Sequence, residues 1–298
     1  MNSIPQTAGL IQVGAGNGGG TDATKAHNQP CRIGMGGRTR NTLKQSQADR
    51  PLVSVITVVF NGATTLEHNI RSVMGQDYDN VEHIIIDGGS TDGTTDILRK
   101  YDDHIDYWVS EKDAGIYDAM NKGIALARGE YVGMLNADDY FANPSSLGKI
   151  VGRLRESNAD AVFSCLDIID PDNLGHVLRK YRITRFSSFM LRIGVMPPHP
   201  TFYCKRSCYE KAGPYRTDYR IAADFEMMVR LLFKHSITWS FIDVTTVKMR
   251  AGGLSSSGIK SSWIVNREIV RACTENGLYT NMLILALKLP VRLWERIS

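Results

Sequence analysis

Acidic residues stand at three places in this 298-residue chain where a ligand could be bound or a proton moved. Asp87 follows an apolar β-branched run and opens a glycine-rich turn, and Asp138 and Asp139 stand side by side just after another apolar run. Asp224 begins a segment with helical periodicity. Carboxylates in such places can accept hydrogen bonds, hold a metal ion or take a proton.

Asp87 has a ligand-binding interpretation and a structural one. The glycines at positions 88 and 89 let the backbone turn tightly and approach a ligand, so the Asp87 carboxylate could accept hydrogen bonds from the N–H edge of a nucleobase. Alternatively, Asp87 satisfies the amides of its own turn and Asp92 caps the following helix. We expect a ligand contact for Asp87 and leave Asp92 open.

The pair Asp138 and Asp139 indicates a cation. Adjacent carboxylates repel each other and raise each other's pKa, so the arrangement is unfavourable unless a cation neutralises it. Magnesium and manganese commonly use one or two carboxylates together with water and substrate phosphates. The sequence therefore predicts a Mg²⁺ or Mn²⁺ site here, with a solvated acidic loop as the plainer alternative.

Asp224 is ambiguous when it is considered alone. It lies in the first turn of a helix predicted over residues 223–233, where the helix dipole favours an acidic side chain. Without further information we would interpret it as a helix cap.

Alternating strands and helices position these residues. Runs typical of buried strands occur at 52–59, 84–86, 107–109 and 131–135, with helical patterns between them. Successive βα units predict an α/β fold with a mostly parallel central sheet flanked by helices. Such sheets bind ligands at the carboxyl ends of their strands, which is where Asp87 and the acidic pair fall.

Composition divides the chain into three parts. Residues 1–50 hold nine of the 27 glycines and six Lys or Arg against two Asp, which predicts a disordered basic extension. They include a G-x-G-x-x-G match that begins at Gly14, but no amphipathic helix follows it. Residues 51–255 form the predicted α/β domain, and residues 256–298 form C-terminal helices.

Charge and apolar content limit the partners and the location. A formal charge of +4 is too small and diffuse to predict a nucleic-acid partner, although it favours an anionic ligand. Five scattered cysteines form no zinc pattern and fit a reducing compartment. The chain shows neither a secretory signal nor an apolar run long enough to span a bilayer, so we expect a cytoplasmic protein.

Four segments together resemble the glycosyltransferase family 2 enzymes, which have the GT-A fold. They are residues 53–61, 87–93, 136–139 and the Ala-Ala-Asp at 222–224, in the order and approximate spacing of that family. A further segment at 110–123 is similar to a subgroup that builds bacterial exopolysaccharide, lipopolysaccharide or glycolipid glycans.

The resemblance implies a nucleotide-diphosphate sugar donor, a glycan or lipid-linked acceptor, and inversion at the anomeric carbon. It assigns donor binding to Val58, Phe60, Asn61, Asp87, Asn121 and Asp138. Asp139 is the implied chief metal ligand, with Asp138 beside it, and Asp224 is the implied general base. Asn136 departs from the first acid of the D-x-D motif in many relatives, which leaves the details of the metal site open.

The C-terminal stretch 281–297 has basic residues at successive i+4 positions, Lys288, Arg292 and Arg296, among apolar ones. It could lie along a membrane surface, at the inner face of the plasma membrane, or pack against the rest of the protein. The pattern favours neither.

Three other functions fit part of the pattern. A nucleotidyltransferase would also use carboxylates and a metal on an α/β sheet, but the turn at residues 61–64 lacks the Lys or Arg that it would need for phosphate binding. A noncatalytic nucleotide-sugar-binding protein, or a dinucleotide-binding module built on Gly14, is the alternative outside the enzymes.

Overall fold

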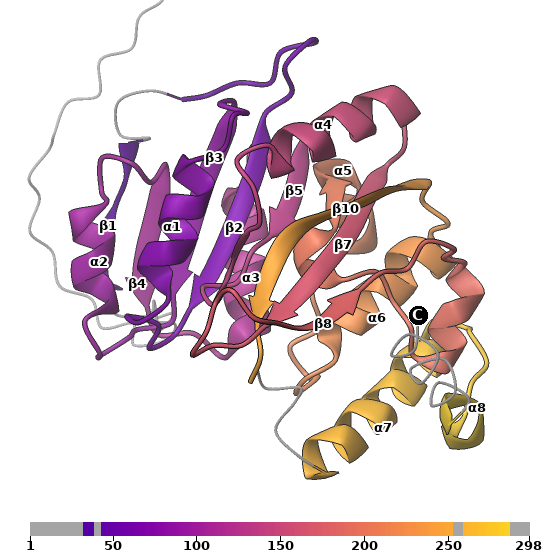
Figure 1. The fold of residues 1–298 in the computed structure, drawn as a ribbon. Helices are drawn as coiled ribbons and strands as arrows, with labels where there is room; N and C mark the ends of the chain where they lie inside the picture. The colour runs from indigo at the N-terminus through magenta and orange to yellow at the C-terminus, as the bar shows by residue number, and fades with distance from the viewer. Residues whose placement is uncertain (1–31, 39–42, 253–258, 287–298) are drawn as a thin grey trace, which may run out of the picture.

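The first half of the protein alternates strands and helices, as predicted. The computed structural model describes residues 32–38, 43–252 and 259–286 (Figure 1). Its early elements are β2 (Val53–Val59), α1 (Leu66–Met74), β3 (Val81–Asp87), α2 (Thr94–Lys100), β4 (Tyr107–Glu111), α3 (Ile116–Leu126) and β5 (Tyr131–Met134). Strands β4, β3, β2 and β5 lie in this spatial order, and each neighbouring pair is parallel. The predicted parallel sheet is therefore confirmed for the core.

Mostly antiparallel pairs extend the sheet in the second half. The strands there are β6 (Asp139–Phe141), β7 (Ala161–Ile169), β8 (Val177–Tyr181), β9 (Tyr203–Lys205) and β10 (Trp239–Arg250). Strand β9 joins the two halves because it pairs antiparallel with both β5 and β7. Strand β10 runs parallel to β7 and antiparallel to β6.

The later helices are α4 (Ser146–Ser157), α5 (Arg206–Ala212), α6 (Ala223–Val229), α7 (Ile259–Glu275) and α8 (Met282–Ala286). Of these helices, α4 and α5 pack against the strands of the second half. Helix α6 continues as a π-helical turn, Arg230–Lys234, so the helix predicted over 223–233 changes its hydrogen-bond pattern after Val229. Helix α7 packs against α6 beyond the end of the sheet (Figure 1).

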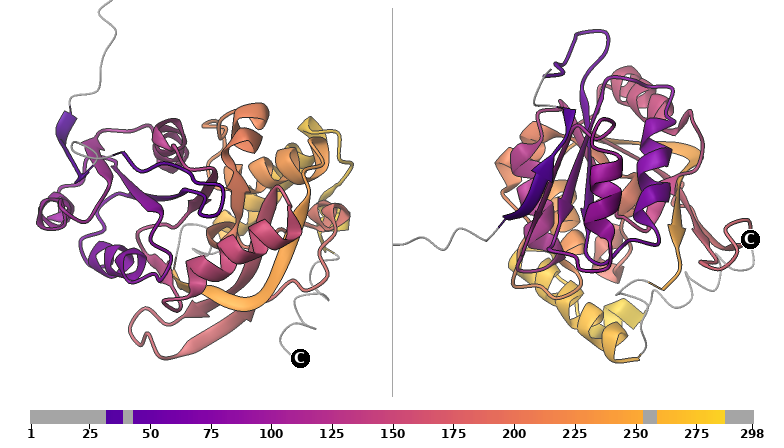
Figure 2. Two further views of the ribbon diagram at one scale, coloured as in Figure 1. Left: turned by 90° about the horizontal axis from the view of Figure 1, so that it is seen from above. Right: turned by 90° about the vertical axis from the view of Figure 1, so that its left-hand side faces the viewer.

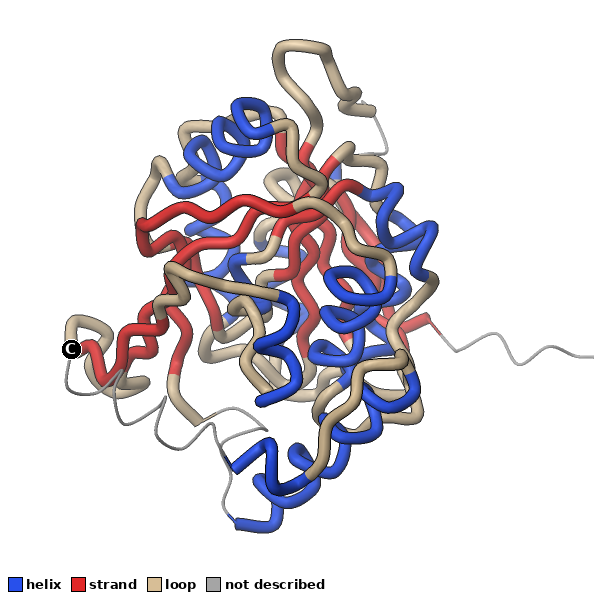
Figure 3. The backbone as a smooth tube through the Cα atoms, turned by 90° about the vertical axis from the view of Figure 1, so that its right-hand side faces the viewer, coloured by secondary structure: helices blue, strands red, loops and turns tan. Residues whose placement is uncertain are grey.

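Apolar side chains on both faces of β2 explain why helices cover both sides of the sheet. Val55 and Val59 belong to the clusters beneath α1, α2 and α4. Ile56 and Val58, which point the other way, belong to the cluster that includes α3, α5 and α6. Figures 2 and 3 show the resulting twisted layer of strands between two layers of helices.

Part of the N-terminal segment forms a strand, so the prediction of disorder is wrong for that part. Strand β1 (Arg32–Gly36) pairs antiparallel with β4 at the edge of the sheet. A Cβ on Gly36 would overlap Trp108 Nε1 and Asp102 Oδ1, two atoms that are joined by a hydrogen bond of 2.6 Å. Glycine is therefore needed for the close approach of the strand, whereas composition alone suggested that it marked disorder.

Several predicted features fall outside the described residues. These are the motif that begins at Gly14 and the basic positions Lys288, Arg292 and Arg296. Helix α8 covers only the start of the stretch predicted at 281–297. In the described part of the chain, no helix combines the length and the apolar character that crossing a membrane requires.

Candidate active site

Three turns meet at the carboxyl end of β2. The carbonyl oxygen of Val58 accepts a hydrogen bond from Ala137 N (3.3 Å), which follows β5, and that of Val59 accepts from Gly88 N (2.9 Å), which follows β3. These bonds continue the parallel ladders beyond the strands. The structure thus brings together the turns that carry Asp87 and the acidic pair, as the sequence predicted.

The turn after β2 presents an aromatic side chain and an unusual backbone conformation. Val58 is buried, whereas Phe60 is 67% exposed. Asn61 has a φ of +51°, which few residues other than glycine and asparagine adopt readily. Its N–H donates to Ser90 Oγ (2.7 Å) and its Oδ1 accepts from Thr91 N (3.0 Å), so this turn is tied to the turn after β3.

The carboxylate of Asp87 is turned into the protein. Asp87 is fully buried, and its Oδ2 accepts from Ser90 N (3.1 Å) and from Ser110 Oγ (2.5 Å). Ser90 Oγ donates to Oδ1. Because three donors bind this carboxylate, the contacts of Asp87 match the turn-shaping alternative, and the expected contact with a nucleobase remains a prediction.

Asp113 is an acidic residue at this edge that the sequence interpretation overlooked. A Cβ on Gly88 would lie 2.5 Å from Asp113 Oδ2, so the Asp113 carboxylate occupies the space beside that glycine. Its Oδ1 accepts from Gly115 N (2.9 Å), and burial raises the pKa of this half-buried side chain. Asp113 follows β4 closely, so the rule that selected Asp87 could have found it.

Asp139 is buried without the hydrogen bonds that a buried carboxylate requires. It is 1% exposed, and neither carboxylate oxygen has a hydrogen-bond partner among the described residues. Burial, followed by the charge of Asp138, raises the pKa of Asp139 well above its ordinary value. Burial also raises the pKa of Asp138. A cation would supply the missing interactions, so the arrangement fits the predicted metal site.

The acidic pair would need help to complete a coordination shell. Among the residues that the structure describes, no group of three or more His, Cys, Asp or Glu side chains is arranged to hold a metal ion. Asp138 and Asp139 could therefore provide only part of a shell, and water and donor phosphates would have to provide the rest.

Two side chains that lie far apart in the sequence bind the acidic turn, residues 136–139, which carries Asp138 and Asp139. Asn69 of α1 donates its amide to the carbonyl oxygens of Asn136 and Asp139, at 2.9 Å each. Arg250, at the end of β10, donates to the carbonyl oxygen of Asp138. Sequence reasoning missed both residues, since neither belongs to a motif. Their contacts link the acidic turn to the first helix and to the last strand of the sheet.

Asp224 occupies the second position of α6, and its environment suits proton transfer. Its Oδ1 accepts from Phe225 N (2.8 Å), the N–H of the next residue in the first turn. Burial raises the pKa of Asp224 to about 6, against backbone hydrogen bonds that lower it, and the charge of Glu268 adds a smaller upward contribution. At neutral pH this carboxylate is mostly ionised yet more basic than an ordinary aspartate, which suits a general base.

The amide of Asn121 links α3 to the loop before α6. Its Nδ2 donates to the carbonyl oxygen of Tyr215 (2.9 Å), and its Oδ1 accepts from Tyr215 N (2.7 Å). The Tyr215 hydroxyl is 2.8 Å from His199 Nε2, and burial lowers the pKa of His199 to about 4. His199 is thus neutral at physiological pH, and the predicted contact of Asn121 with a donor remains a prediction.

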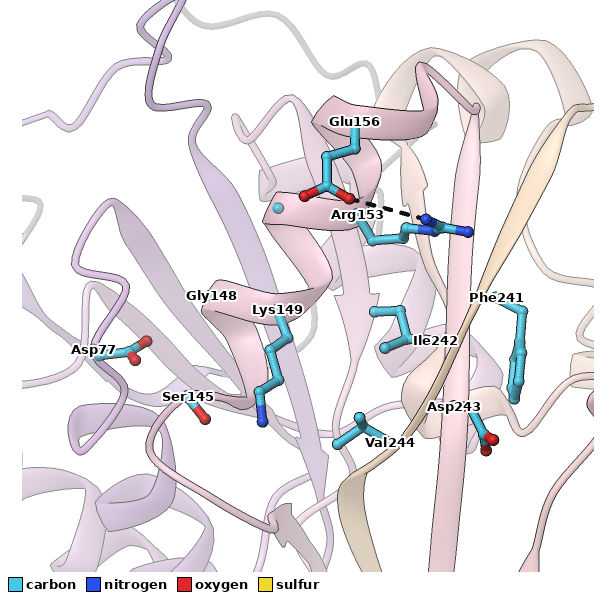
Figure 4. A pocket seen from close by; sticks show the side chains of 11 residues that line it. Asp77, Ser145, Gly148, Lys149, Arg153, Glu156, Phe241, Ile242, Asp243 and Val244 are labelled. Atoms are coloured by element: carbon cyan, nitrogen blue, oxygen red, sulfur yellow. Dashed lines mark ion pairs between the residues drawn. The ribbon is translucent and has the colours of Figure 1, made fainter.

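A hollow of about 640 Å³ lies elsewhere, between α4 and β10 (Figure 4). Lys149, Arg153 and Glu156 line it from α4, and Asp243 lines it from β10. None of the predicted site residues contributes to it. The acids at the strand ends, and not this hollow, are therefore the candidate active site.

The parallel core sheet, with acidic turns at its carboxyl edge, has the arrangement of the GT-A fold. The family model described as glycosyl transferase family 2 matches residues 54–212, which is more than half of the chain. The chain belongs to this family, and it is a glycosyltransferase.

Two relatives illustrate the family membership. An uncharacterised glycosyltransferase of Mycobacterium tuberculosis is 36% identical over 182 residues, which are 60% of this chain and 68% of that protein. A PGL/p-HBAD biosynthesis glycosyltransferase of Mycobacterium bovis is 25% identical over 252 residues, which are 83% of this chain and 92% of that protein. The second relative is thus named for a role in PGL/p-HBAD biosynthesis.

Two solved structures share the fold. S. aureus TarS 1-349 in complex with UDP-GlcNAc has a TM-score of 0.58 at 19% identity, covering 79% of this chain and 70% of that one. The mannosyltransferase PcManGT of Pyrobaculum calidifontis, in complex with GDP-Man and Mn²⁺, has a TM-score of 0.55 at 18% identity and covers 86% of both chains. At such identities the likeness demonstrates the fold alone.

Proposed function

We propose that this protein is an inverting transferase that moves a sugar from a nucleotide-diphosphate donor to a glycan or lipid-linked acceptor in cell-surface glycan biosynthesis. The observation that carries the proposal is Asp139, a buried carboxylate without hydrogen-bond partners among the described residues, at the ligand-binding edge of the sheet. The M. bovis relative supports the biosynthetic role, and the two ligand complexes support the donor class.

The donor nucleoside would lie at the carboxyl end of β2. Val58, Phe60 and Asn61 would form its wall, with the exposed Phe60 ring available for packing against the base or the ribose. Asp113 Oδ2 would accept a hydrogen bond from an N–H of the base, while Asp87 would keep the neighbouring turn in shape. A carboxylate there favours uracil, thymine or guanine, which carry ring N–H donors.

The diphosphate would lie over the acidic turn. Asp139 and Asp138 would hold Mg²⁺ or Mn²⁺, and the Mn²⁺ complex of PcManGT supports a divalent metal. When bound, the metal would offset the negative charge that develops on the leaving diphosphate. Asp138 and Asn121 complete the donor-binding residues that the family resemblance implies.

The reaction proposed is a single displacement. Asp224 takes the proton of the acceptor hydroxyl as that oxygen bonds to the anomeric carbon, and the nucleoside diphosphate leaves from the opposite face. The anomeric configuration is thereby inverted. General-base catalysis of this kind typically contributes about 10²- to 10⁴-fold to the rate.

Contact with a membrane surface is the second part of the proposal. The basic positions that suggested it lie outside the described residues, but the described helices add exposed apolar side chains, with Trp263 54% and Leu283 81% exposed. The Arg267 guanidinium lies 4.7 Å from the centroid of the Trp263 ring. Aromatic and basic side chains together suit an anionic lipid surface. Deleting the residues after Thr280 should reduce co-sedimentation with anionic vesicles, and unchanged co-sedimentation would refute the idea.

A binding and turnover screen tests the enzymatic proposal. Calorimetry with uridine, thymidine and guanosine diphosphates should reveal Mn²⁺-dependent binding that Asp139→Asn abolishes. Hydrolysis of the matching nucleotide sugar should follow the same dependence. Pyrophosphate release from a nucleoside triphosphate and a sugar phosphate would instead identify a nucleotidyltransferase. Binding without turnover of any donor would leave a noncatalytic nucleotide-sugar-binding protein.

A further inference from the structure

Helix α7 is hydrogen-bonded to the backbone just before α6 through the carboxylate of Glu268. Its Oε1 accepts from Arg220 N (2.7 Å), and its Oε2 accepts from Ile221 N (2.9 Å) and Ala222 N (2.8 Å). Ala222 directly precedes α6, and Asp224 follows two residues later. Three consecutive backbone donors therefore share a single charged acceptor that is brought in from another helix.

The three N–H groups that Glu268 binds lie just before the first residue of α6, Ala223. The first N–H groups of a helix, and those just before it, need acceptors that the helix cannot supply. No side chain caps α6 at its N-cap residue, Ala222. Hydrogen bonds to an ionised carboxylate are shorter and stronger than those between neutral groups. Glu268 therefore holds the backbone just before Asp224 by three charge-assisted hydrogen bonds.

Two other contacts fix the same stretch of backbone. Tyr117 of α3 donates its hydroxyl to the carbonyl oxygen of Ile221. Asn276, at the end of α7, donates to Glu226 Oε1 at 3.1 Å, two residues beyond Asp224. The segment that carries Asp224 is thus held on both sides of the acid, and two of the three contacts come from the region of α7.

We propose that Glu268 is a positioning residue for Asp224: through its bonds to three consecutive N–H groups it fixes the backbone that aims this carboxylate at the acceptor. The inference rests on the proposed role of Asp224 as general base. It makes α7 a part of the active site, whereas the sequence had assigned residues 256–298 to an appended helical region.

Among the described residues, Glu268 is the charged side chain that affects the pKa of Asp224. Among the described side chains, Tyr117 from α3 and Tyr215 from the preceding loop also interact with Asp224. Burial first, and the charge of Asp224 as well, raise the pKa of both tyrosines above the usual value, so their hydroxyls stay protonated. Glu268 contributes the charge that adds to burial in raising the pKa of Asp224.

Glu268→Gln tests the inference, with Glu275→Gln as a matched control. Glu275 lies on the same helix and pairs with Arg216 and Arg271 at 2.9 Å each, so its variant loses the same charge and a comparable set of bonds. Glu268→Gln should lower kcat about 10- to 100-fold with little change in the donor KM, because a slightly misplaced base is costly. The acid limb of its pH–rate profile should move to lower pH. Glu275→Gln should change neither quantity.

A direct titration separates this inference from the proposed function. The ¹³C signal of the Asp224 carboxyl, assigned by its loss in Asp224→Asn, should titrate with a pKa of about 6 in the wild type. The pKa should fall in Glu268→Gln and stay unchanged in Glu275→Gln. This readout needs neither donor nor acceptor, so it tests the influence of Glu268 on Asp224 even in a protein that transfers no sugar. Absence of sugar transfer, or retained turnover in Asp224→Asn, would refute the proposed function and leave this test intact.

Equal titration and equal turnover in Glu268→Gln and Glu275→Gln would overturn the inference. Should Glu268→Gln fail to fold, Glu268→Asp takes its place. The shorter acid keeps the charge but cannot reach all three N–H groups, so the acid limb should stay near that of the wild type while kcat falls. Wild-type kcat in Glu268→Asp would also count against the positioning role.

Discussion

The side-chain amide of Asn69 lies 2.9 Å from the carbonyl oxygen of Asp139. The same nitrogen donates to the carbonyl oxygen of Asn136 at 2.9 Å, and Asn69 Oδ1 accepts from Thr57 Oγ1 at 3.2 Å. Asn69 itself is fully buried. One asparagine of α1 therefore fixes, from the inside, the backbone of the turn that carries the acidic pair.

Asn69→Leu should impair both stability and metal-dependent nucleotide binding. Leucine has a similar volume but removes the side-chain donor to both carbonyl oxygens, and that of Asn136 then keeps only the bond from Asp139 N (2.9 Å). Such a loss costs about 1–3 kcal/mol of unfolding free energy. The turn would then no longer hold Asp138 and Asp139 in place. Urea unfolding and calorimetry with Mn²⁺ and the preferred nucleoside diphosphate measure the two effects.

Asn276→Leu is the control for this prediction. Asn276 is also buried and donates to two acceptors, Glu226 Oε1 and the carbonyl oxygen of Ala272, but it lies at the end of α7. It should lose comparable stability and keep metal-dependent binding. Equal binding by the two variants would show that Asn69 stabilises the fold without organising the metal site.

Asp139→Asn should stabilise the metal-free protein at neutral pH. An unfolded aspartate has a pKa of about 3.9, whereas burial and the charge of Asp138 hold that of Asp139 well above its ordinary value in the folded state. Between these two pKa values the folded protein binds more protons than the unfolded chain, so the stability of the wild type falls as the pH rises. Asparagine does not titrate and escapes this loss.

Urea unfolding with a chelator, from about pH 4 to pH 8, measures the difference. The excess of the unfolding free energy of Asp139→Asn over that of the wild type should grow as the pH rises from about 4, and it should vanish below that pH. Added Mn²⁺ should make the wild type the more stable of the two proteins, because the variant has lost the Asp139 carboxylate as a metal ligand. Parallel pH dependences of the two proteins would argue against an ionisable, unpaired Asp139.

The strand-end acids were predictable because local patterns encode them. Apolar β-branched runs indicate buried strands, and parallel strands place their carboxyl ends at one edge, so the acidic pair at 138 and 139 could be placed from the sequence. The inward orientation of the Asp87 side chain could not be predicted in this way. Its burial depends on Ser110, which lies 23 residues away in the next strand of the sheet.

The supporting residues depend on contacts that no local pattern encodes. Asn69 lies 70 residues from Asp139, and Glu268 lies 46 residues from Ala222. In the sequence, Asn69 is only a polar residue beside the apolar stripe of α1. The N-terminal strand was missed for a related reason, since its glycines lower the apolar content on which a prediction of order depends.

Gly36→Ala should detach β1 from the sheet. A methyl group at this position would overlap Trp108 Nε1 and Asp102 Oδ1, so one of them must move and their hydrogen bond must distort. Overpacking of this kind costs about 1–3 kcal/mol. Brief trypsin digestion with mass spectrometry should find faster cleavage after Arg38 and Lys44.

Gly34→Ala is the matched control on the same strand. The nearest atoms to its added methyl group, on the Trp108 ring, lie at 3.2 Å, so a small shift accommodates it. Its cleavage pattern should stay close to that of the wild type. If Gly36→Ala were cleaved no faster than Gly34→Ala, the tight packing of Gly36 on Trp108 would be wrong.

Turnover should fall on the acid side with an apparent pKa near 6. Asp224 must be ionised to accept a proton, and its pKa is about 6. Lowering the pH from 7 to 5 should therefore reduce kcat roughly tenfold. Asp224→Asn should lose about 10²- to 10⁴-fold of turnover and, as measured by calorimetry, bind the donor normally. An acid limb near pH 4, or near-normal turnover in this variant, would assign the proton transfer to another group.

Asp113→Asn should weaken the preference among nucleobases. A carboxylate only accepts hydrogen bonds, so it favours a base with a ring N–H, such as uracil, and repels the bare N3 of cytosine. Asparagine can donate as well as accept. The ratio of the affinities for uridine and cytidine diphosphates, measured with Mn²⁺, should therefore narrow by about tenfold, equivalent to about 1.4 kcal/mol.

Asp118→Asn and Asp87→Asn complete the comparison. Asp118 lies close to Asp113 in the sequence but accepts from Ala114 N (3.1 Å) and pairs with Lys122 (3.5 Å), so its variant should keep the base preference. Asp87→Asn removes the charge that Ser90 and Ser110 bind, so it should lower stability and leave the base preference intact. If Asp87→Asn narrowed the ratio and Asp113→Asn did not, the base contact would belong to Asp87, as the sequence first suggested.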